Sequence, residues 1–256
     1  MELRVLGAHQ CESVNSRLVS ILVDQFLALD AGGLTSGLSL ADQQRVKAIF
    51  LTHQHFDHIR DLATFGINTY SWGVTEIYGL DSVLDVVSTH LLNDVLYPDF
   101  RRRPSPDKPA FRFRSVEPGK EIVIGQYRIL PVPVNHGVPA VGYWVVSRDG
   151  KSFFYTGDTG GGCASCWEIV TPDLLLIEVC MSNQYDAIAR ESMHMTPRML
   201  REELVGFKRA KGYLPRVVAV HMILAIEDEI RREVAEVARE LGADIQLGYE
   251  GMTIVL

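Results

Sequence analysis

The amino-acid sequence predicts an α/β (α+β) fold, with sheets inside and helices outside, as a single domain over residues 1–256. Short apolar runs with strand character alternate with longer segments that carry apolar residues at helical spacing. Apolar residues make up 47% of the chain and charged residues 22%, which is ordinary for a globular protein. Because strands and helices are mixed along the chain, we expect both around one core.

The predicted strands share one feature, since each leads to a polar residue of a type that binds metals or protons. The runs are residues 21–23 and 26–29 before Asp30, 46–51 before His53, 127–134 before His136, 151–155 before Asp158, 174–177 before Glu178, and 216–220 before His221. Functional sites of α/β proteins gather at the carboxyl ends of strands. The six polar residues at these strand ends therefore predict one active-site edge, and residues 244–248 and 252–256 predict two further strands.

Three helices are predicted between the strands. Residues 81–96 carry an apolar stripe at helical spacing. A second helix begins at Thr196, which suits the N-cap, with Pro197 in the first turn. The amphipathic segment 227–241 predicts a third helix, and Gly242 is expected to end it.

Residues 52–58, Thr-His-Gln-His-Phe-Asp-His, are the most informative segment. Neutral imidazole and carboxylate are ligands that Zn²⁺ prefers. Four such ligands on one tight turn cannot all face a single ion. The spacing therefore indicates two ions, with His53 and His55 on one, and Asp57 and His58 on the other. The alternative is a chance grouping of surface or core histidines.

The other ligands follow from the need for about four donors around each ion. His136 lies in an Asn-His-Gly turn after a strand, and it completes the imidazoles of the first ion. Asp158 lies in Gly-Asp-Thr-Gly, where small neighbours allow close approach, and we expect it to bridge the two ions. His221 supplies the third ligand of the second ion. His136 or His221 taken alone could instead be structural.

These motifs resemble the metallo-β-lactamase superfamily, whose HxHxDH motif, downstream His, Gly-Asp-Thr-Gly-type Asp and late His occur here in order. The resemblance covers residues 22–221. It implies an αββα four-layer sandwich with two divalent ions at one edge of the sheets. Asp30 matches the early Asp of the family, which supports a ligand. Zn²⁺ is the expected metal, while Mn²⁺ or Fe would accept much of this ligand set.

Residues 177–183 and 192–200 resemble the phosphodiesterase branch of the superfamily, which includes class II cyclic-nucleotide phosphodiesterases and RNase Z. The second segment, Ser-Met-His-Met-Thr-Pro, places His194 before a helix start. Residues 89–106 resemble the His…Pro-Asp-Phe…Pro-Ser stretch of the cyclic-nucleotide enzymes. Two positions depart from the class II motif: Phe56 replaces a Leu, and Asp61 replaces a small residue.

This resemblance predicts a phosphodiesterase that acts on a 3′,5′-cyclic nucleotide or a similar small phosphodiester. Two ions lower the pKa of a bridging water, and the resulting hydroxide attacks phosphorus. His194 is the candidate general acid or transition-state clamp, paired with Asp57 as the RNase Z resemblance implies. The alternatives are an RNase Z-like tRNA 3′-processing endonuclease, a thioester or lactone hydrolase on the same scaffold, and a nonenzymatic binding protein with a decayed site.

Composition adds further expectations. The net charge of −7 argues against a general nucleic-acid binder, so RNA is an open but less favoured partner. No apolar run is long enough to span a bilayer, and no signal peptide is recognised, so we expect a cytoplasmic protein without membrane contact. A homodimer is a reasonable expectation.

Two segments have no assigned role. Residues 101–114 carry six positive charges and one acid, Asp107. They predict either a phosphate-binding surface or, as we prefer, a solvated Pro-rich loop. Cys163 and Cys166 form a CxxC pair without a second pair of ligands, and all four cysteines, including Cys11 and Cys180, are expected to be free thiols.

Overall fold

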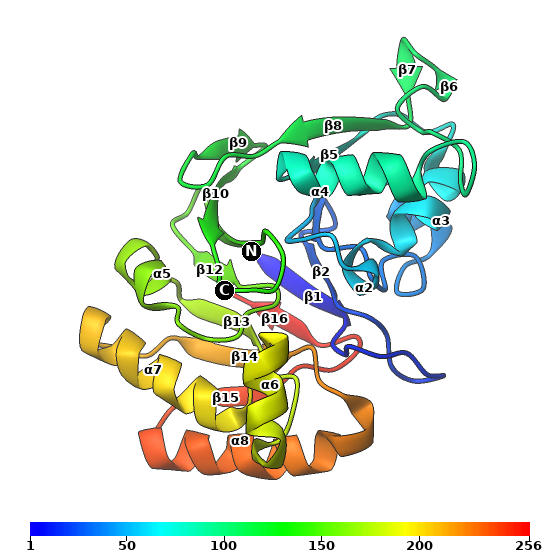
Figure 1. Cartoon of the computed structure of the whole chain (residues 1–256). Helices are drawn as coiled ribbons and strands as arrows, with labels where there is room; N and C mark the ends of the chain where they lie inside the picture. The colour runs from blue at the N-terminus through cyan, green and yellow to red at the C-terminus, as the bar shows by residue number, and fades with distance from the viewer. The chain divides into compact units, whose positions relative to one another are not determined.

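The computed structural model describes all 256 residues. The chain divides into two compact units. The first unit comprises Met1–Ala8, Glu12–Glu117 and Tyr249–Val255, and the second comprises His9–Cys11, Pro118–Gly248 and Leu256. Each unit is built on its own seven-stranded sheet (Figure 1). None of the helices is long and apolar enough to cross a membrane.

The sheet of the first unit has the strand order β16-β1-β2-β3-β4-β5-β8. The pairs β3–β4, β4–β5 and β5–β8 are parallel, while the pairs β16–β1, β1–β2 and β2–β3 are antiparallel. The strands are β1 (Glu2–Gly7), β2 (Ser20–Val23), β3 (Leu27–Leu29), β4 (Ala48–Phe50), β5 (Thr75–Gly79), β8 (Phe111–Ser115) and β16 (Thr253–Val255). The central strands are buried on both faces, which explains their near-continuous apolar sequences.

Short helices accompany this sheet. Their apolar side chains, such as Leu62 and Phe65, form its core together with Phe100. The helices are α1 (Leu40–Gln43), α2 (Phe56–Ile59), α3 (Asp61–Thr69) and α4 (Asp81–Val86), which continues as a π-helical turn over Val87–Leu91. Helix α4 lies beside β5 and β8 (Figure 1). A small hairpin of β6 (Pro104–Ser105) and β7 (Lys108–Pro109) completes the unit.

The predicted helix over residues 81–96 ends early, at Leu91. The Asn93 side chain explains this end, because its Oδ1 accepts the N–H groups of Val95 and Leu96 at 3.0 and 2.9 Å. An Asn that binds the backbone just ahead of it competes with helical hydrogen bonds. The predicted helix is correct over residues 81–91, and its predicted extension to residue 96 is wrong.

The sheet of the second unit has the strand order β15-β14-β13-β12-β11-β10-β9. Strands β12 to β15 are parallel, and β9 to β12 pair antiparallel, so β10, β12, β13 and β14 run in one direction. The strands are β9 (Ile122–Ile124), β10 (Tyr127–Pro133), β11 (Val141–Ser147), β12 (Ser152–Tyr155), β13 (Leu174–Glu178), β14 (Arg216–Val220) and β15 (Ile245–Leu247).

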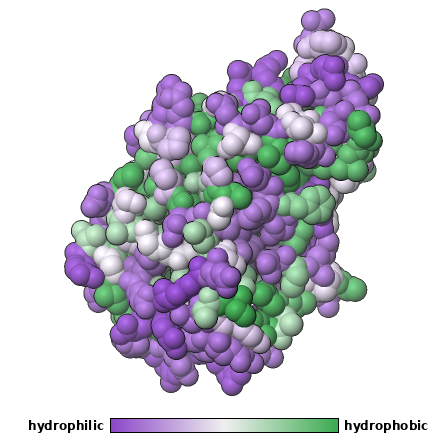
Figure 2. Space-filling view, viewed as in Figure 1, coloured by the Kyte–Doolittle hydropathy of each residue, from purple (hydrophilic) through white to green (hydrophobic).

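The helices of the second unit are α5 (Ala164–Ile169), α6 (Asp186–Ser192), α7 (Pro197–Lys211) and α8 (Glu227–Leu241), with single turns at Asn183–Tyr185 and Leu224–Ile226. The predicted start of α7 is confirmed, since Thr196 Oγ1 accepts the Met199 N–H at 3.4 Å. Helix α8 has the predicted bounds and ends at Gly242 with a left-handed φ of 60°. Helices α7 and α8 pack side by side, and the surface over α8 is mostly hydrophilic (Figures 1 and 2).

Every predicted strand run forms a strand, but the runs are divided between the two sheets. The strands before Asp30 and His53 belong to the first sheet, and those before His136, Asp158 and Glu178 belong to the second. The C-terminal runs also separate, because β15 pairs with β14 whereas β16 pairs with β1. The predicted site residues therefore lie at strand ends of two sheets, one in each unit.

Candidate metal centre

In the first unit, the donor turn follows β4 and leads into α2. His53 and His58 have no exposed surface, and the His53 ring centroid lies 4.6 Å from that of His55 and 4.2 Å from that of His58. Asp57 and His58 lie in the first turn of α2. The change from strand to helix thus gathers all four predicted donors of this segment within one short turn.

Asp30 organises this turn from the end of β3. It is fully buried, and its backbone has a left-handed φ of 56°. One carboxylate oxygen accepts the Thr52 N–H at 2.8 Å, and the other accepts His58 Nδ1–H at 2.8 Å. The supporting role expected for Asp30 is therefore visible in its hydrogen bonds to the donor turn.

These hydrogen bonds determine which nitrogen of each ring is protonated. The Thr52 hydroxyl donates to Asp30, so His53 Nδ1, 3.0 Å from Thr52 Oγ1, acts as the donor to that hydroxyl. His58 Nδ1 donates to a carboxylate, which only accepts when ionised. In both rings Nε2 therefore keeps a lone pair for a metal ion.

Asp57 and His58 also have the spacing of two ligands on one ion. Asp57 Oδ2 lies 3.5 Å from His58 Nε2. Two ligand atoms at about 2.0–2.1 Å from a tetrahedral Zn²⁺ are roughly 3.3–3.4 Å apart. Their separation fits a shared ion.

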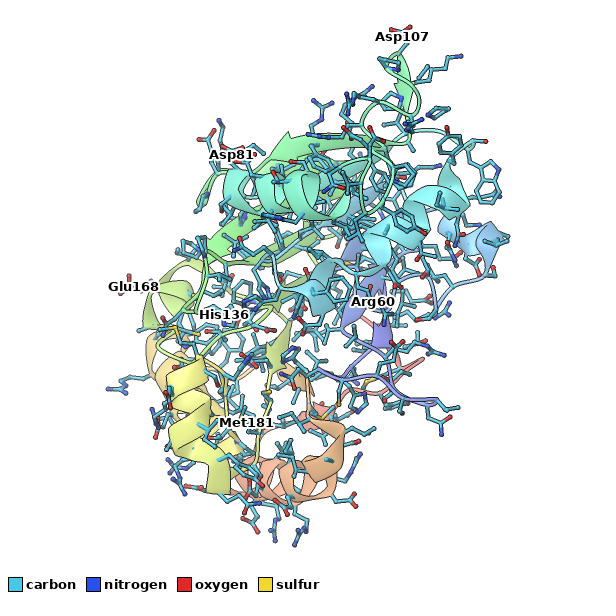
Figure 3. All side chains as sticks on the ribbon, turned by 45° about the vertical axis from the view of Figure 1, so that its right-hand side comes forward. Arg60, Asp81, Asp107, His136, Glu168 and Met181 are labelled. Atoms are coloured by element: carbon cyan, nitrogen blue, oxygen red, sulfur yellow. The ribbon has the colours of Figure 1, made fainter.

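In the second unit, the strands that run in one direction deliver the remaining residues at their carboxyl ends. His136 follows β10 (Figure 3), Asp158 follows β12, Glu178 ends β13 and His221 follows β14. His221 Nε2 lies 3.4 Å from Asp158 Oδ2, which again matches the edge of a tetrahedral site. His136 Nδ1 donates to the Met193 carbonyl at 3.1 Å, so its Nε2 also keeps a lone pair.

Glu178 connects the donors of the second unit, a role that the sequence reasoning did not assign. This carboxylate has no exposed surface. It accepts the Thr159 N–H at 2.5 Å and His194 Nδ1–H at 3.0 Å, and it lies 3.4 Å from His221 Nδ1. The sequence does carry a signal for this role, because Glu178 is an acid at the end of a fully apolar strand. A charge buried there requires partners.

His194 lies just before α7 with 12% of its side chain exposed. Burial by itself lowers the pKa of this imidazole, but the hydrogen bond and charge of Glu178 outweigh burial and leave the pKa raised. The ring therefore holds a proton more firmly than an ordinary histidine, as a proton donor requires.

Each unit by itself carries donors of the types that suit divalent metal ions. The imidazoles of His53, His58 and His136 have Nδ1 committed to a protein acceptor, which is the arrangement that orients metal-binding histidines. Mixed imidazole and carboxylate donors suit Zn²⁺ and also Mn²⁺ or Fe.

The two departures from the class II motif have different environments. Phe56 is 62% exposed and contributes a large apolar surface beside the donor turn. Asp61 is buried and accepts the N–H and hydroxyl of Thr35, both at 2.7 Å, together with Arg60 Nε at 3.0 Å. Asp61 therefore anchors the loop before α1 and has a structural function.

The basic segment forms the β6–β7 hairpin and β8 instead of a loop without structure. Its surface at the hairpin is hydrophilic, and Asp107 lies at the tip (Figures 2 and 3). Asp99 accepts bonds from Arg101 and Arg102, and Asp94 accepts bonds from Arg102 and Arg103.

Farther along the segment, Glu76 pairs with Arg114 at 2.8 Å and with Arg112 at 3.9 Å. Counting charges within residues 101–114 missed these acids, which lie outside the segment. The solvent exposure that we predicted for this segment is confirmed for the three consecutive arginines, but their charges are largely paired.

All four cysteines are free thiols, as expected, and three of them, including the CxxC pair, are buried. His90 is exposed on the π-helical turn.

Comparison with known families now defines the class of this chain. Residues 21–222 match the model of the Beta-lactamase superfamily domain, and the chain belongs to this superfamily. This membership confirms the metallo-β-lactamase resemblance inferred from residues 22–221, and it agrees with the expectation of a hydrolase.

Two curated relatives are named as enzymes that cleave phosphodiester bonds. A 3′,5′-cyclic-nucleotide phosphodiesterase of Schizosaccharomyces pombe is 37% identical over 100 residues, which cover 37% of this chain and 26% of the relative. Ribonuclease Z of Methanopyrus kandleri is 26% identical over 129 residues, which cover 48% of this chain and 38% of the relative. The chain thus spans well under half of the length of each.

Among solved structures, unliganded yeast PDE1 superposes with a TM-score of 0.82 at 18% identity, covering 100% of this chain and 99% of that chain. At this identity the similarity establishes the fold alone. The predicted mixed α/β fold of metallo-β-lactamase type is therefore confirmed.

Proposed function

We propose that this protein is a dinuclear metal-dependent phosphodiesterase that cleaves a 3′,5′-cyclic nucleotide or a similar small phosphodiester. The observation that carries the proposal is the set of hydrogen bonds at Nδ1 of His53, His58 and His136, which orient the three rings as metal-binding histidines are oriented. The similarity to a fungal 3′,5′-cyclic-nucleotide phosphodiesterase supports the substrate class.

The proposed ligand assignment follows the order of motifs in the superfamily. By that order, one ion would be held by His53, His55, His136 and Asp158. The other would be held by Asp57, His58, His221 and Asp158, so that Asp158 would serve both. Zn²⁺ is the proposed metal, with Mn²⁺ or Fe as alternatives.

When bound, two divalent ions supply an activated water and neutralise the phosphate oxygens. The protein contributes a proton on the other side of the reaction. His194 Nδ1–H is held by Glu178, so Nε2 is the atom from which this ring donates a proton to the departing ribose oxygen. Glu178 keeps the ring in that orientation and stabilises its charge. Asp57 is the carboxylate that the RNase Z resemblance pairs with His194.

An RNase Z-like tRNA 3′-processing activity is the second candidate, favoured by the similarity to Ribonuclease Z of Methanopyrus kandleri. The pairing of the arginines of residues 101–114 with Asp94, Asp99 and Glu76 speaks for a small substrate, because paired arginines attract an RNA backbone less strongly.

The test is metal analysis of the purified protein followed by a substrate screen. The screen contains bis-p-nitrophenyl phosphate, cyclic AMP, cyclic GMP and a precursor tRNA, with a thioester and a lactone as substrates of other hydrolases. We expect bound transition metal and turnover of the small phosphodiesters, both lost in Asp158→Ala. Cleavage of precursor tRNA alone would establish the second candidate, and turnover of only the lactone or thioester would overturn the proposed substrate class.

A further inference from the structure

The CxxC pair lies at the start of α5, on the second unit. Cys163 is the N-cap residue and Cys166 lies in the first turn, so the i, i+3 spacing brings both side chains to one face of the helix. Each residue is only 1% exposed. The two side chains lie close enough for each thiol to shift the pKa of the other. The pair thus has the proximity that a disulfide requires.

The thiols belong to a hydrogen-bonded chain between two loops of this unit. Cys166 Sγ donates to the Pro133 carbonyl at 3.1 Å, three residues before His136. Cys163 Sγ lies 3.6 Å from the hydroxyl of Thr159, the residue after Asp158. The chain runs from Thr159 through both sulfurs to Pro133, and its two ends adjoin proposed metal ligands.

Glu203 on α7 holds the same turn in place from the outside. Its carboxylate accepts the N–H of Gly162 at 2.6 Å, the N–H of Cys163 at 3.3 Å and Trp167 Nε1–H at 2.8 Å. A surface pocket of about 420 Å³, lined in part by Gly162, Ala164 and Glu203, opens beside the turn. The pocket thus borders residues on either side of Cys163, while Glu203 keeps the backbone of the turn positioned.

The two sulfurs differ in acidity, as a nucleophilic thiol and its resolving partner do. The hydrogen bond from Cys163 favours a thiolate on Cys166 and lowers the pKa of Cys166. The same bond, together with burial, raises the pKa of Cys163. A thiolate, and not a thiol, attacks an oxidant.

We propose that Cys163 and Cys166 form a reversible disulfide, a modification site that couples the redox state of this turn to the loops of His136 and Asp158. With hydrogen peroxide as the oxidant, Cys166 Sγ attacks one peroxide oxygen, the O–O bond breaks, and water leaves after taking a proton. Cys163 Sγ then attacks the Cys166 sulfenic acid and releases a second water. Two thiols lose two electrons and two protons, the peroxide gains them, and a dithiol reverses the reaction by thiol–disulfide exchange.

The disulfide breaks the hydrogen-bonded chain at its Pro133 end. Cys166 loses the S–H that donates to Pro133, and Cys163 loses its thiol hydrogen. The loops of His136 and Asp158 are then no longer joined through this chain. The disulfide itself is independent of the proposed function, whereas the effect on metal retention rests on it.

The first experiment measures the disulfide directly in the folded full-length protein. Reduced protein is titrated with hydrogen peroxide, alkylated with iodoacetamide, and mapped by peptide mass spectrometry. We expect the peptide with residues 163–166 to lose two hydrogens and resist alkylation, and a dithiol to restore both thiols. Cys163→Ser and Cys166→Ser should abolish this product, and Cys11→Ser should not. Thiols at 163 and 166 that both remain open to alkylation in the oxidised wild type would overturn the proposal.

The second experiment measures metal retention against a chelating dye in the reduced and oxidised forms of the same preparation. We expect the oxidised form to bind metal roughly tenfold more weakly, the lower range for loss of a group that positions a ligand. Equal retention in both forms would overturn the coupling. Absence of metal from the reduced form would instead contradict the proposed function, and it would leave the result of the thiol mapping intact.

Discussion

His194 Nδ1 lies 3.0 Å from Oε2 of Glu178, whose carboxylate has no exposed surface. A buried carboxylate carries a large desolvation cost, and three polar partners offset it here: the Thr159 N–H, His194 and His221. The bond to Nδ1 fixes which ring nitrogen of His194 remains for chemistry. One buried acid thus links a proposed proton donor to a proposed metal ligand.

Replacing the proposed proton donor should separate catalysis from metal binding. In His194→Ala, we expect turnover of bis-p-nitrophenyl phosphate to fall by ~10²–10⁴-fold, the usual contribution of one general acid. Metal content, measured by mass spectrometry of the digested protein, should stay at the wild-type value. His90→Ala removes an exposed histidine and serves as the matched control. Loss of metal from His194→Ala would show that this residue is a ligand.

Replacing Asp30 should weaken metal binding without removing any ligand. Asp30→Asn retains a residue that tolerates the left-handed φ of 56°, but it replaces the carboxylate that accepts His58 Nδ1–H. We expect metal affinity to fall by about 10–100-fold, as for other groups that orient a metal-binding histidine.

The control for this change is Asp61→Asn, since Asp61 is also buried but bonds Thr35 and Arg60 instead of a proposed ligand. It should lower the free energy of unfolding and leave metal affinity within error of the wild type. Equal losses of affinity in both variants, measured by competition with a chelating dye, would mean that Asp30 acts only through general stability.

Local patterns predicted those parts of the fold that depend on neighbours along the chain. The N-cap of α7 at Thr196 and the end of α8 at Gly242 each depend on a few neighbouring residues, and both are observed. The early end of the helix at Leu91 depends on one Asn side chain, whose bonds to Val95 and Leu96 an apolar pattern does not register.

Contacts between distant segments could not be predicted in the same way. Glu76 lies far along the chain from Arg114, and the charge of residues 101–114 therefore appeared unpaired in the sequence. The role of Glu178 likewise depends on Thr159, His194 and His221, which come from three different loops. A residue type at a strand end indicates that a site exists, while its partners follow only from the tertiary structure.

Asp99 should stabilise the protein in a pH-dependent way. This buried carboxylate loses solvation, but hydrogen bonds from Arg101 and Arg102 outweigh that cost and lower its pKa. A group with a lowered pKa contributes stability above its unfolded pKa, and this contribution is lost as the pH falls through the lower folded value.

Asp99→Asn should therefore lower the free energy of unfolding by about 1.5–3 kcal/mol at neutral pH, the range for hydrogen bonds to charged groups. The difference from wild type in urea unfolding should shrink as the pH is lowered below roughly 4, the unfolded value for Asp. Asp107→Asn, at the exposed tip of the β6–β7 hairpin, should have little effect at either pH. A difference that stays constant with pH would exclude ionisation as the source of the effect.

Two helical glycines should respond in opposite directions to the same substitution. A Cβ on Gly66 in α3 would lie 2.2 Å from Cε2 of Phe100, a fully buried ring, so Gly66→Ala should destabilise the protein by about 1–3 kcal/mol through overpacking. A Cβ on Gly206 in α7 would meet its nearest neighbour, Trp167 Cδ1, only at 4.0 Å. Gly206→Ala should therefore stabilise by about 0.5–1 kcal/mol, the usual gain in helix propensity. Urea unfolding of both variants measures the two changes, and a stabilising Gly66→Ala would mean that α3 and Phe100 are not in contact in solution.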